Sequence, residues 1–530
     1  MTLEDDDWQL STIPALCARA AEIYGDAPAI EDGVSISFVE LDRMRRQFAK
    51  ALIASGIASG DRVMIWAPNT YKWVVAALGI ASAGAVLIPV NTRFKGPEVW
   101  DLAERGGAKL MVSVGAFLGV YYPDQLTPET RRQLTAVVVT DGARGDDVAW
   151  EAFLRRAEQV SDADLEARIA PITGDSLADI LFTSGTTGRS KGVMYAHGQF
   201  LRVVKAWIDR VGMRRGDRVL VIPPFFHAFG YRSGALASLI VGATLLPHQT
   251  YDAETVLNRV QEDRVTVIPG PPTIFQGMLG HARFHDFDRS SLRLGITGGA
   301  VVPSVLIERM RSDLGFSGVC NGYGLTECGG YGAMCNHDDP SEVLAFTAGP
   351  PLPGIEMKMM DAGGNVLPDG ETGEVVIRGY IVMKGYFNDP EATARTIDAN
   401  GWLHTGDIGR FDAGGNLIIE DRLKDMFITG GFNCYPAEIE RMLSQHPAIG
   451  QVAVIGVPDE RLGEVGRAYV MLRPGTQADE PAIIAWSRQN MANFKVPRSV
   501  EIVAALPTSL QGKVLKRELR DQFLASGKSS

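Results

Sequence analysis

The chain has 530 residues, of which 45% are hydrophobic and 22% are charged. This length predicts two or more domains, and this composition is that of a globular protein rather than a disordered or membrane-embedded one. The net charge of −11 gives no general attraction for nucleic acid or anionic lipid. Nucleic acid is therefore not expected as a partner, and any bound phosphate must be met by local basic groups.

The cysteines and the N-terminus indicate the compartment. The five cysteines are odd in number and contain no CxxC pair, which is typical of buried thiols in a reducing compartment. The N-terminal MTLEDDDWQL has neither the basic nor the apolar region of a secretion signal. The longest apolar run, Val74 to Val90, is rich in Ala and Gly and predicts a buried helix and strand. We expect a cytoplasmic protein without a membrane span, and the sequence leaves a homo-oligomer open.

The clearest helix is predicted over residues 37 to 55. Ser37 and Glu40 form a capping box at its start, and Gly56 follows its end. One face is apolar and is expected to pack on the core: Phe38, Leu41, Met44, Phe48 and Leu52.

Helices and strands then alternate along the chain. Helices are predicted over 71 to 82, 198 to 211, from 232 and over 253 to 263, and strands over 61 to 66, 86 to 90, 219 to 222, 244 to 246 and 265 to 268. Such alternation predicts parallel sheets covered by helices.

The last third of the sequence has a different texture. From about 347 to 421, short strands and Gly/Asp turns predict a small β-barrel. The elements predicted beyond it are helices over 436 to 443 and 481 to 491, a basic terminal helix, and strands over 452 to 455, 467 to 472 and 499 to 503. The predicted fold class is α/β: a large N-terminal domain, residues 1–422, with two parallel-type α/β subdomains and the small barrel, and a small α+β C-terminal domain, residues 423–530.

Residues 183 to 193, TSGTTGRSKGV, are dense in groups that bind a polyphosphate. Glycines let the backbone N–H groups turn inward, hydroxyls add donors, and the lysine supplies charge. The candidate phosphate-binding residues are Thr183, Ser184, Gly185, Thr186, Thr187, Gly188 and Lys191. The spacing of a Walker A loop is absent and a strand-like segment follows, so a P-loop NTPase is excluded. A solvated linker is the alternative, which the apolar runs on both sides disfavour.

A second motif, NGYGLTE, occupies residues 321 to 327. Asn321, Gly322, Tyr323 and Gly324 suit a nucleotide, because the glycines allow close approach and the tyrosine can stack on adenine. Thr326 can donate to the α-phosphate, and Glu327 is a hard oxygen ligand for Mg²⁺. The alternative is an ordinary strand-to-turn segment.

Three further segments carry charged groups at turns. They are Trp402 to Asp407, Asp421 to Asp425, and Pro507 to Lys513. Taken singly, the first has little meaning, the second fits a charged surface turn and the third fits a solvated basic tail.

Together, these five motifs resemble the adenylate-forming superfamily of acyl- and aryl-CoA synthetases, luciferases and peptide-synthetase adenylation domains. They follow the family's order over nearly the whole chain, with Ser190 where the family usually has proline. The resemblance implies that Asp407 and Arg422 bind the ribose, that the C-terminal domain is mobile about a hinge at Lys424, and that Lys513 is the catalytic lysine.

The resemblance also places two further groups of residues. It implies that His227, within the aromatic run Pro224 to Tyr231, lines or gates the acyl pocket, and that Gly298, Gly299 and Ala300 contribute to the cofactor site. A lone histidine flanked by aromatic residues is otherwise more often a core residue.

The resemblance implies an acid:CoA ligase that uses ATP, Mg²⁺ and coenzyme A. The carboxylate of the acid attacks the α-phosphate, pyrophosphate leaves, and the thiol then displaces AMP. The motifs are most similar to those of actinobacterial ligases for the propanoate side chain of steroid-ring intermediates, and glycines near the acyl site predict room for a bulky acid. The alternatives are a medium-chain fatty acyl- or aryl-CoA ligase, an enzyme that loads a carrier-protein thiol, and a luciferase-like oxygenase or silent ligand-binding relative.

Overall fold

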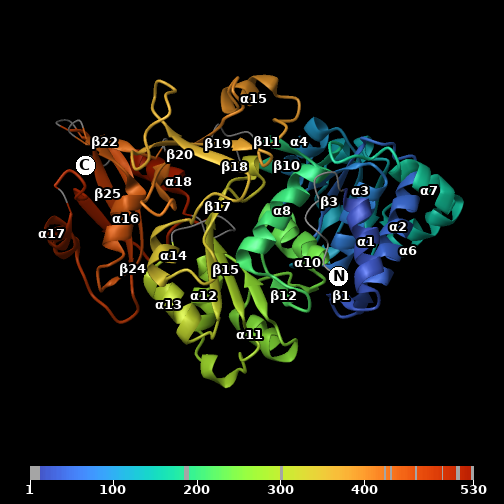
Figure 1. Cartoon of the computed structure of the whole chain (residues 1–530), viewed down its shortest axis with the longest axis horizontal. Helices are drawn as coiled ribbons and strands as arrows, with labels where there is room; N and C mark the ends of the chain where they lie inside the picture. The colour runs from blue at the N-terminus through green and yellow to red at the C-terminus, as the bar shows by residue number, and fades with distance from the viewer. Residues whose placement is uncertain are drawn as a thin grey trace.

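The computed structural model describes residues 12–183, 190–298, 302–422, 425–429, 432–459, 462–491, 493–508 and 514–526, with the backbone alone at 421, 422, 432 and 433. Figure 1 shows an elongated molecule. The first part of the chain forms the lobe on the right, the middle part forms a sheet at the bottom centre, and the C-terminal part forms the lobe on the left.

A seven-stranded sheet organises the first lobe. Its spatial order is β11 (Lys191–Ala196), β10 (Leu177–Thr183), β4 (Val86–Pro89), β3 (Arg62–Trp66), β5 (Ala108–Ser113), β8 (Ala136–Val139) and β9 (Val148–Ala149). All neighbours are parallel except β10 and β11, which form an antiparallel hairpin. The helices of this part are α1 (Ile13–Tyr24), α2 (Phe38–Ala54), α3 (Tyr71–Ser82), α4 (Gly96–Gly106), α5 (Pro128–Gln133), α6 (Trp150–Arg155) and α7 (Asp162–Ile169), with short 3-10 turns at Tyr122–Gln125 and Arg156–Gln159 and a small hairpin of Ala116–Phe117 with Val120–Tyr121.

The structure confirms the helix predicted over residues 37 to 55. The Ser37 hydroxyl caps α2 by accepting a hydrogen bond from the Glu40 backbone N–H at 3.2 Å. The apolar face differs from the prediction at one turn, because Met44 is only partly buried and Arg45 is buried instead. Arg45 is accommodated by an ion pair with Asp42 at 2.6 Å.

An eight-stranded sheet forms the middle of the molecule. Its order is β17 (Ala333–Met334), β16 (Gly318–Tyr323), β15 (Leu294–Gly298), β14 (Val267–Pro269), β12 (Arg218–Val221), β13 (Thr244–Pro247), β1 (Pro28–Glu31) and β2 (Ser35–Ser37). The inner strands are parallel, and the two ends of the sheet are antiparallel. The helices here are α8 (His197–Val211), α9 (Ala228–Gly230), the π-helix η4 (Tyr231–Leu236), α10 (Ala237–Val241), α11 (Ala253–Glu262), α12 (Pro272–Leu279), α13 (Ser304–Ser312) and α14 (Ser341–Phe346), with 3-10 turns at Phe284–Asp286 and η6 (Thr326–Cys328).

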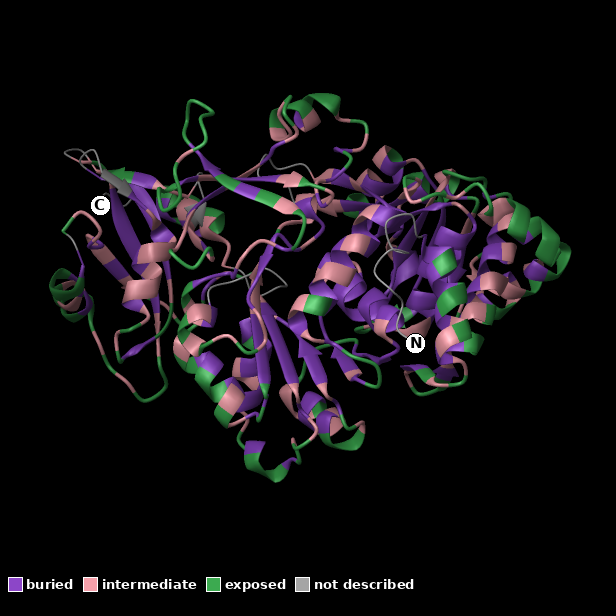
Figure 2. Cartoon of the chain, in the orientation of Figure 1, coloured by how far each residue is buried: buried purple, intermediate pink, exposed green. Residues whose placement is uncertain are grey.

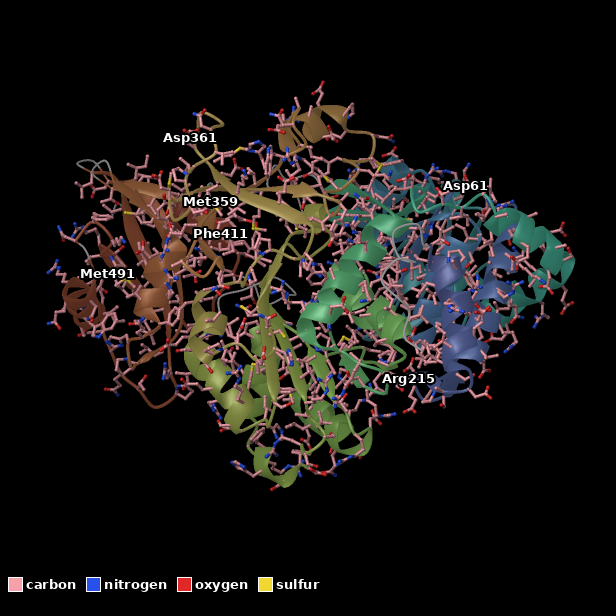
Figure 3. All side chains as sticks on the ribbon, viewed as in Figure 1. Asp61, Arg215, Met359, Asp361, Phe411 and Met491 are labelled. Atoms are coloured by element: carbon pink, nitrogen blue, oxygen red, sulfur yellow. The ribbon has the colours of Figure 1, made fainter. Side chains whose placement is uncertain are left out.

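The region predicted as a small β-barrel corresponds to a four-stranded antiparallel sheet. Its strands are β18 (Ile355–Met360), β19 (Gly373–Gly379), β20 (Leu403–Phe411) and β21 (Leu417–Arg422), and α15 (Pro390–Thr396) lies between β19 and β20 in the chain. The expected turns form at its edges: the Asp361 carboxylate accepts from the backbone N–H groups of Gly363 and Asn365 at 2.8 and 2.9 Å. Figure 3 shows Asp361 in the loop at the top of the molecule.

The C-terminal residues form a separate sheet with its own apolar clusters. Its strands are β22 (Phe427–Thr429), β23 (Phe432–Cys434), β24 (Ile449–Asp459), β25 (Gly463–Leu472) and β26 (Ser499–Ile502), and its helices are α16 (Pro436–Leu443), α17 (Glu480–Asn490) and α18 (Lys516–Ala525). The domain boundary at residues 422 and 423 stays a prediction, and Lys424 lies outside the described residues.

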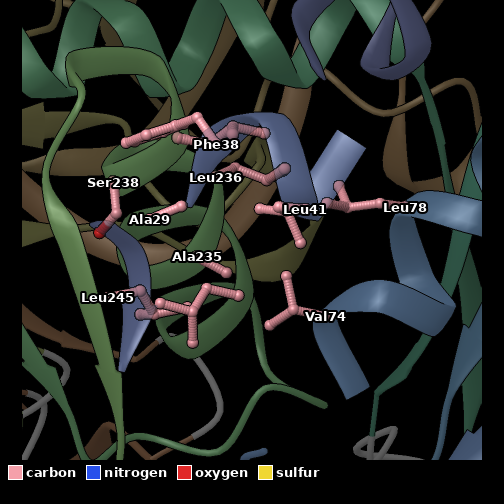
Figure 4. A pocket seen from close by; sticks show the side chains of 11 residues that line it. Ala29, Phe38, Leu41, Val74, Leu78, Ala235, Leu236, Ser238 and Leu245 are labelled. Carbon is pink, nitrogen blue, oxygen red and sulfur yellow. The ribbon is translucent and has the colours of Figure 1, made fainter. Parts of the chain in front are cut away.

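The core lies along the central strands of the large sheets, whereas outer helices such as α7 are largely exposed (Figure 2). All five cysteines are buried and free, as the sequence predicts. Figure 4 shows a cavity between α2, α3 and α10 that is lined mostly by aliphatic side chains, including Leu41, Val74 and Leu245. Its volume of about 10 Å³ is at the lower limit for one water molecule, so it is a packing defect and not a substrate site. In the described ranges, no helix combines the length and apolar character that a bilayer crossing requires.

Candidate active site

The predicted phosphate loop joins the two strands of a hairpin. Thr183, the last residue of β10, is opposite Lys191, the first residue of β11, and its hydroxyl donates to the Lys191 carbonyl at 3.5 Å. The loop thus leads into a strand and not into a helix, as expected when a Walker A loop is excluded. The other predicted phosphate-binding residues, Ser184 to Gly188, lie outside the described residues.

Arg105 of α4 holds the C-terminal end of this loop. Its guanidinium donates to the Ser190 carbonyl at 2.7 Å and to the Ser190 hydroxyl at 2.8 Å. The same group is paired with Asp101 one turn earlier and lies 5.1 Å from the centre of the Phe182 ring. Two parallel N–H donors in a rigid fork define position better than one flexible contact. The position where the family usually has proline is therefore fixed here by a side chain from another element.

We expect Arg105→Ala to raise the KM for ATP about tenfold with a smaller change in kcat. The variant removes both hydrogen bonds from Ser190, and a hydrogen bond with a charged partner contributes about 1.5–3 kcal/mol. The measurement is acid-dependent exchange of pyrophosphate into ATP at varied ATP. Asp101→Asn, which retains both Arg105–Ser190 contacts, is the control, and an unchanged KM in Arg105→Ala contradicts the prediction.

The nucleotide motif starts at the end of β16. Gly322 lies opposite Gly298 of β15, and a Cβ on Gly298 would come within 2.9 Å of the Gly322 carbonyl. A Cβ on Gly324 would meet the Gly330 carbonyl at 2.2 Å. Side chains are therefore excluded from both positions. Gly299 and Ala300, which were predicted to join this site, lie outside the described residues.

Tyr323 and Asp407 meet across 84 residues of sequence. The tyrosine hydroxyl donates to Asp407 Oδ2 at 2.6 Å. Burial, with the neighbouring carboxylate, raises the pKa of Tyr323 well above its usual value, so the hydroxyl remains a donor. Arg422 of β21 lies opposite Asp407 in the strand pairing. Of Arg422 the structure describes the backbone alone. The predicted adenine and ribose segments therefore converge.

Asn321, in contrast, is used within the fold. Its side-chain amide donates to the carbonyls of Leu344 and Thr347 at 3.0 and 3.2 Å. These bonds attach the end of α14 to β16. In this structure the side-chain amide of Asn321 therefore binds backbone carbonyls, and a contact between Asn321 and a nucleotide stays a prediction.

Thr326 and Glu327 lie on η6, directly after the nucleotide motif. The Glu327 carboxylate accepts a hydrogen bond from the Tyr386 hydroxyl at 2.9 Å. The backbone carbonyl of Glu327 accepts one from the Met383 N–H at 3.0 Å. Tyr386 also faces the phosphate hairpin, because Lys191 Nζ lies 4.7 Å from the centre of its ring. Sequence reasoning missed this tyrosine, which touches two predicted site residues.

His227 caps the short helix α9. Its Nδ1 accepts the Phe229 N–H at 3.3 Å, so the proton of the neutral ring is on Nε2. Burial, with a smaller contribution from the nearby Arg232 guanidinium, lowers the pKa of His227 to about 4. The ring is therefore neutral at pH 7, which suits a pocket wall and not an anion-binding group.

Arg232 directly follows the aromatic run Pro224 to Tyr231 and connects it to the phosphate hairpin and to the turn after the nucleotide motif. It lies on η4, is fully buried, and pairs with Asp179 of β10 at 3.0 Å. A second nitrogen of its guanidinium donates to the Gly329 carbonyl at 3.1 Å, just beyond η6. π-helical turns are rare and often occur at functional sites. The sequence around Arg232 does not predict these contacts, because their partners Asp179 and Gly329 are distant in the sequence.

Comparison with known families agrees with this arrangement. A family model described as "AMP-binding enzyme" matches residues 17–387, and one described as "AMP-binding enzyme C-terminal domain" matches residues 438–513. Solved structures have the same fold. An anthranilate CoA ligase, AuaEII, in complex with anthranoyl-AMP has a TM-score of 0.88 at 25% identity, covering 98% of this chain and 99% of its own. ATP-bound MatB from Rhodopseudomonas palustris has a TM-score of 0.85 at 29% identity, covering 98% and 100%.

Curated relatives agree in sequence over almost their whole length. A ligase named for 3-(7a-methyl-1,5-dioxo-octahydro-1H-inden-4-yl)propanoyl:CoA in Mycobacterium tuberculosis is 47% identical over 97% of this chain and 99% of the relative. Its namesake in Rhodococcus jostii is 44% identical over 97% and 99%. A feruloyl-CoA synthase of Amycolatopsis is 35% identical over 95% and 98%. The α/β fold class and the enzyme class predicted from the sequence are confirmed: the chain belongs to the AMP-binding enzyme family, as an AMP-forming acid–thiol ligase.

Proposed function

We propose that this enzyme activates a bulky alicyclic propanoate, derived from the rings of a steroid, to its acyl-adenylate and transfers the acyl group to coenzyme A. The supporting observation is the 47% identity, over 97% of the chain, to a ligase named for a bicyclic dioxo-octahydroindenyl propanoate. Relatives named for aromatic or fatty acids are less similar, at 32% to 35% identity. ATP and CoA are the co-substrates of this reaction.

The described residues take distinct parts in the proposed site. Lys191 supplies positive charge to the phosphates, Asp407 accepts from the ribose hydroxyls, and the segment around the neutral His227 forms a wall of the acyl pocket. The first step places the acid and the α-phosphate in line, so the main contributions are orientation and charge stabilisation. No acid–base triad is needed, because loss of pyrophosphate activates the acid.

Mg²⁺ fits the chemistry of Glu327. No group of three or more His, Cys, Asp or Glu side chains is gathered for a metal within the described residues. A Mg²⁺ ion would thus be held by the Glu327 carboxylate together with the phosphates of ATP, as is usual for this hard ion. Bound there, it neutralises phosphate charge. We further propose a cytoplasmic location, in keeping with five buried free thiols. Sedimentation tests whether the enzyme is a homo-oligomer, which the sequence leaves open.

The experiment that tests the substrate is a panel of acids assayed by AMP release. We expect a bicyclic or alicyclic propanoate to give a kcat/KM at least about tenfold above those of octanoate and 4-coumarate, because a group that fills an apolar pocket leaves less of it empty. A clear preference for acetate, or for a long straight chain, contradicts the proposal. Supplying a carrier-protein thiol in place of CoA tests the alternative acceptor.

A further inference from the structure

The segment 384–387 lies beside the strand that carries the phosphate-loop lysine. Lys384 N–H donates to the Met194 carbonyl at 3.0 Å, and Met194 N–H donates to the Gly385 carbonyl at 3.0 Å. Phe387 N–H donates to the Gly192 carbonyl at 2.7 Å. The segment therefore extends the hairpin as a further antiparallel neighbour of β11.

Tyr386 is held firmly within this segment. Its backbone N–H donates to the Thr393 hydroxyl of α15 at 2.9 Å, and it forms an antiparallel bridge with Val193 of β11. The residue is only 6% exposed. Attachment on both sides of the backbone and burial of the ring leave the side chain little freedom.

The hydroxyl of Tyr386 fixes the carboxylate of Glu327. It donates to Oε1 at 2.9 Å, while the preceding turn binds the Glu327 carbonyl through Met383 N–H at 3.0 Å. A tyrosine hydroxyl has one proton to donate and a carboxylate only accepts, so the direction of this hydrogen bond is fixed.

The ring of the same residue faces Lys191. The ammonium lies 4.7 Å from the ring centre, within the range at which an aromatic face attracts a cation. One side chain thus contacts both a cation and an anion of the site. These two groups come from segments 136 residues apart (327 minus 191), and both must meet the same end of ATP.

We propose that Tyr386 is a positioning residue that holds Glu327 for the metal through its hydroxyl and Lys191 for the phosphates through its ring. This inference rests on the proposed function, because that function gives Glu327 and Lys191 their roles. It adds that the two are oriented by one side chain before ATP arrives. Preorganised groups bind without a further cost of ordering, so loss of either contact weakens a specific part of ATP binding.

The hydroxyl and the ring can be separated by two substitutions. Tyr386→Phe removes only the hydroxyl, and Tyr386→Leu removes the aromatic face as well. Tyr380→Phe is the matched control. The Tyr380 ring also faces a cation, with the Arg202 guanidinium carbon 3.9 Å from its centre, and its hydroxyl donates to the Pro353 carbonyl at 3.0 Å. Within the described structure it touches neither Lys191 nor Glu327.

The readout is binding of a fluorescent ATP analogue at varied Mg²⁺ and in EDTA, alongside pyrophosphate exchange. Tyr386→Phe is expected to raise the Mg²⁺ concentration for half-maximal binding about tenfold, since a hydrogen bond to a carboxylate is lost, and to leave affinity in EDTA unchanged. Tyr386→Leu is expected to weaken affinity in EDTA as well, about threefold or more. Tyr380→Phe is expected to match the wild type in both.

Two outcomes overturn this inference, and a third contradicts the proposed function alone. A wild-type Mg²⁺ dependence in Tyr386→Phe, with an unchanged melting temperature, overturns the role of the hydroxyl. If Tyr386→Leu folds but retains wild-type affinity in EDTA, the role of the ring is wrong. Absence of pyrophosphate exchange in the wild type with every acid contradicts the proposed function, while the binding titrations still decide the role of Tyr386.

Discussion

Lys513→Ala is expected to lose most adenylate formation while still converting supplied acyl-adenylate and CoA to the thioester. In the first half-reaction, the anionic carboxylate must approach the anionic α-phosphate while pyrophosphate leaves, and one ammonium group offsets this concentration of negative charge. Removing one preorganised donor of this kind lowers the rate by about 10² to 10³-fold. The second half-reaction takes place at the acyl carbon and involves no in-line transfer at the α-phosphate, so the charge argument for Lys513 applies to the first step alone.

The chain around Lys513 restricts which basic residue can act. Lys513 lies outside the described residues, but the residues on either side of its segment, Thr508 and Val514, form an antiparallel bridge. Lys516, at the start of α18, is paired with Glu440 at 2.9 Å, and both side chains are 15% exposed. An ammonium held in a partly buried ion pair is not available for a phosphate, so the assignment to Lys513 is retained over its neighbour.

The two half-reactions are measured separately. Pyrophosphate exchange follows the first, and thioester formation from supplied acyl-adenylate follows the second. Arg517→Ala is the control, because Arg517 is a basic residue of α18, close to Lys513 in the sequence, whose side chain is 73% exposed. Equal losses in both half-reactions, with an unchanged fold, refute the assignment.

Much of the fold could be predicted from local pattern. The helix over 71 to 82 and that over 436 to 443 are found with the predicted bounds, since each begins with clear capping or proline chemistry. The strand predicted over 452 to 455 extends over Ile449–Asp459 because β25 pairs along its whole length. Pairing of this kind depends on the neighbouring strand, and the polar residues at the strand ends give no signal of it.

The site was predictable only where a motif is continuous in sequence. The hairpin at Thr183 and Lys191 and the convergence of Tyr323 with Asp407 follow from segments recognisable in the sequence. Arg105 and Tyr386 were not predicted, because neither belongs to a recognisable motif and each reaches Ser190 or Glu327 through a tertiary contact alone. An arginine on an amphipathic helix and a tyrosine in a loop are common, and only the fold gives these two their contacts.

Arg232→Met is expected to destabilise the large N-terminal region by about 3–5 kcal/mol, the usual cost of leaving a buried charge without its partner. Arg232 and Asp179 are 0% and 1% exposed, and the guanidinium makes two hydrogen bonds to the carboxylate at 3.0 and 3.1 Å. Methionine retains an unbranched apolar stem but ends short of the guanidinium carbon, which lies 4.4 and 5.0 Å from the centres of the Tyr195 and Phe200 rings. The expected loss therefore combines the unpaired charge with a small gap between the rings, and its pH dependence isolates the charge.

The destabilisation should depend on pH in a defined direction. Burial raises the pKa of Asp179, and both interactions that lower it come from Arg232. In Arg232→Met the folded-state pKa of Asp179 rises further above the unfolded value, so the folded protein binds a proton that the unfolded chain releases. Stability of the variant then falls as pH rises from the unfolded pKa through the folded one. The difference from the wild type should shrink on acidification and be greatest at neutral pH.

Urea unfolding at several pH values, followed by the tryptophans of the N-terminal region, measures this difference. Arg19→Met is the control, because Arg19 and Glu22 form an exposed ion pair at 3.0 Å that contributes about 1 kcal/mol or less. The decisive comparison is Asp179→Leu combined with Arg232→Met, since replacing both buried charges by apolar groups of similar size is often nearly neutral. If that double variant is at least as unstable as Arg232→Met alone, the unpaired carboxylate is not the cause, and the lost contact with the Gly329 carbonyl accounts for the effect instead.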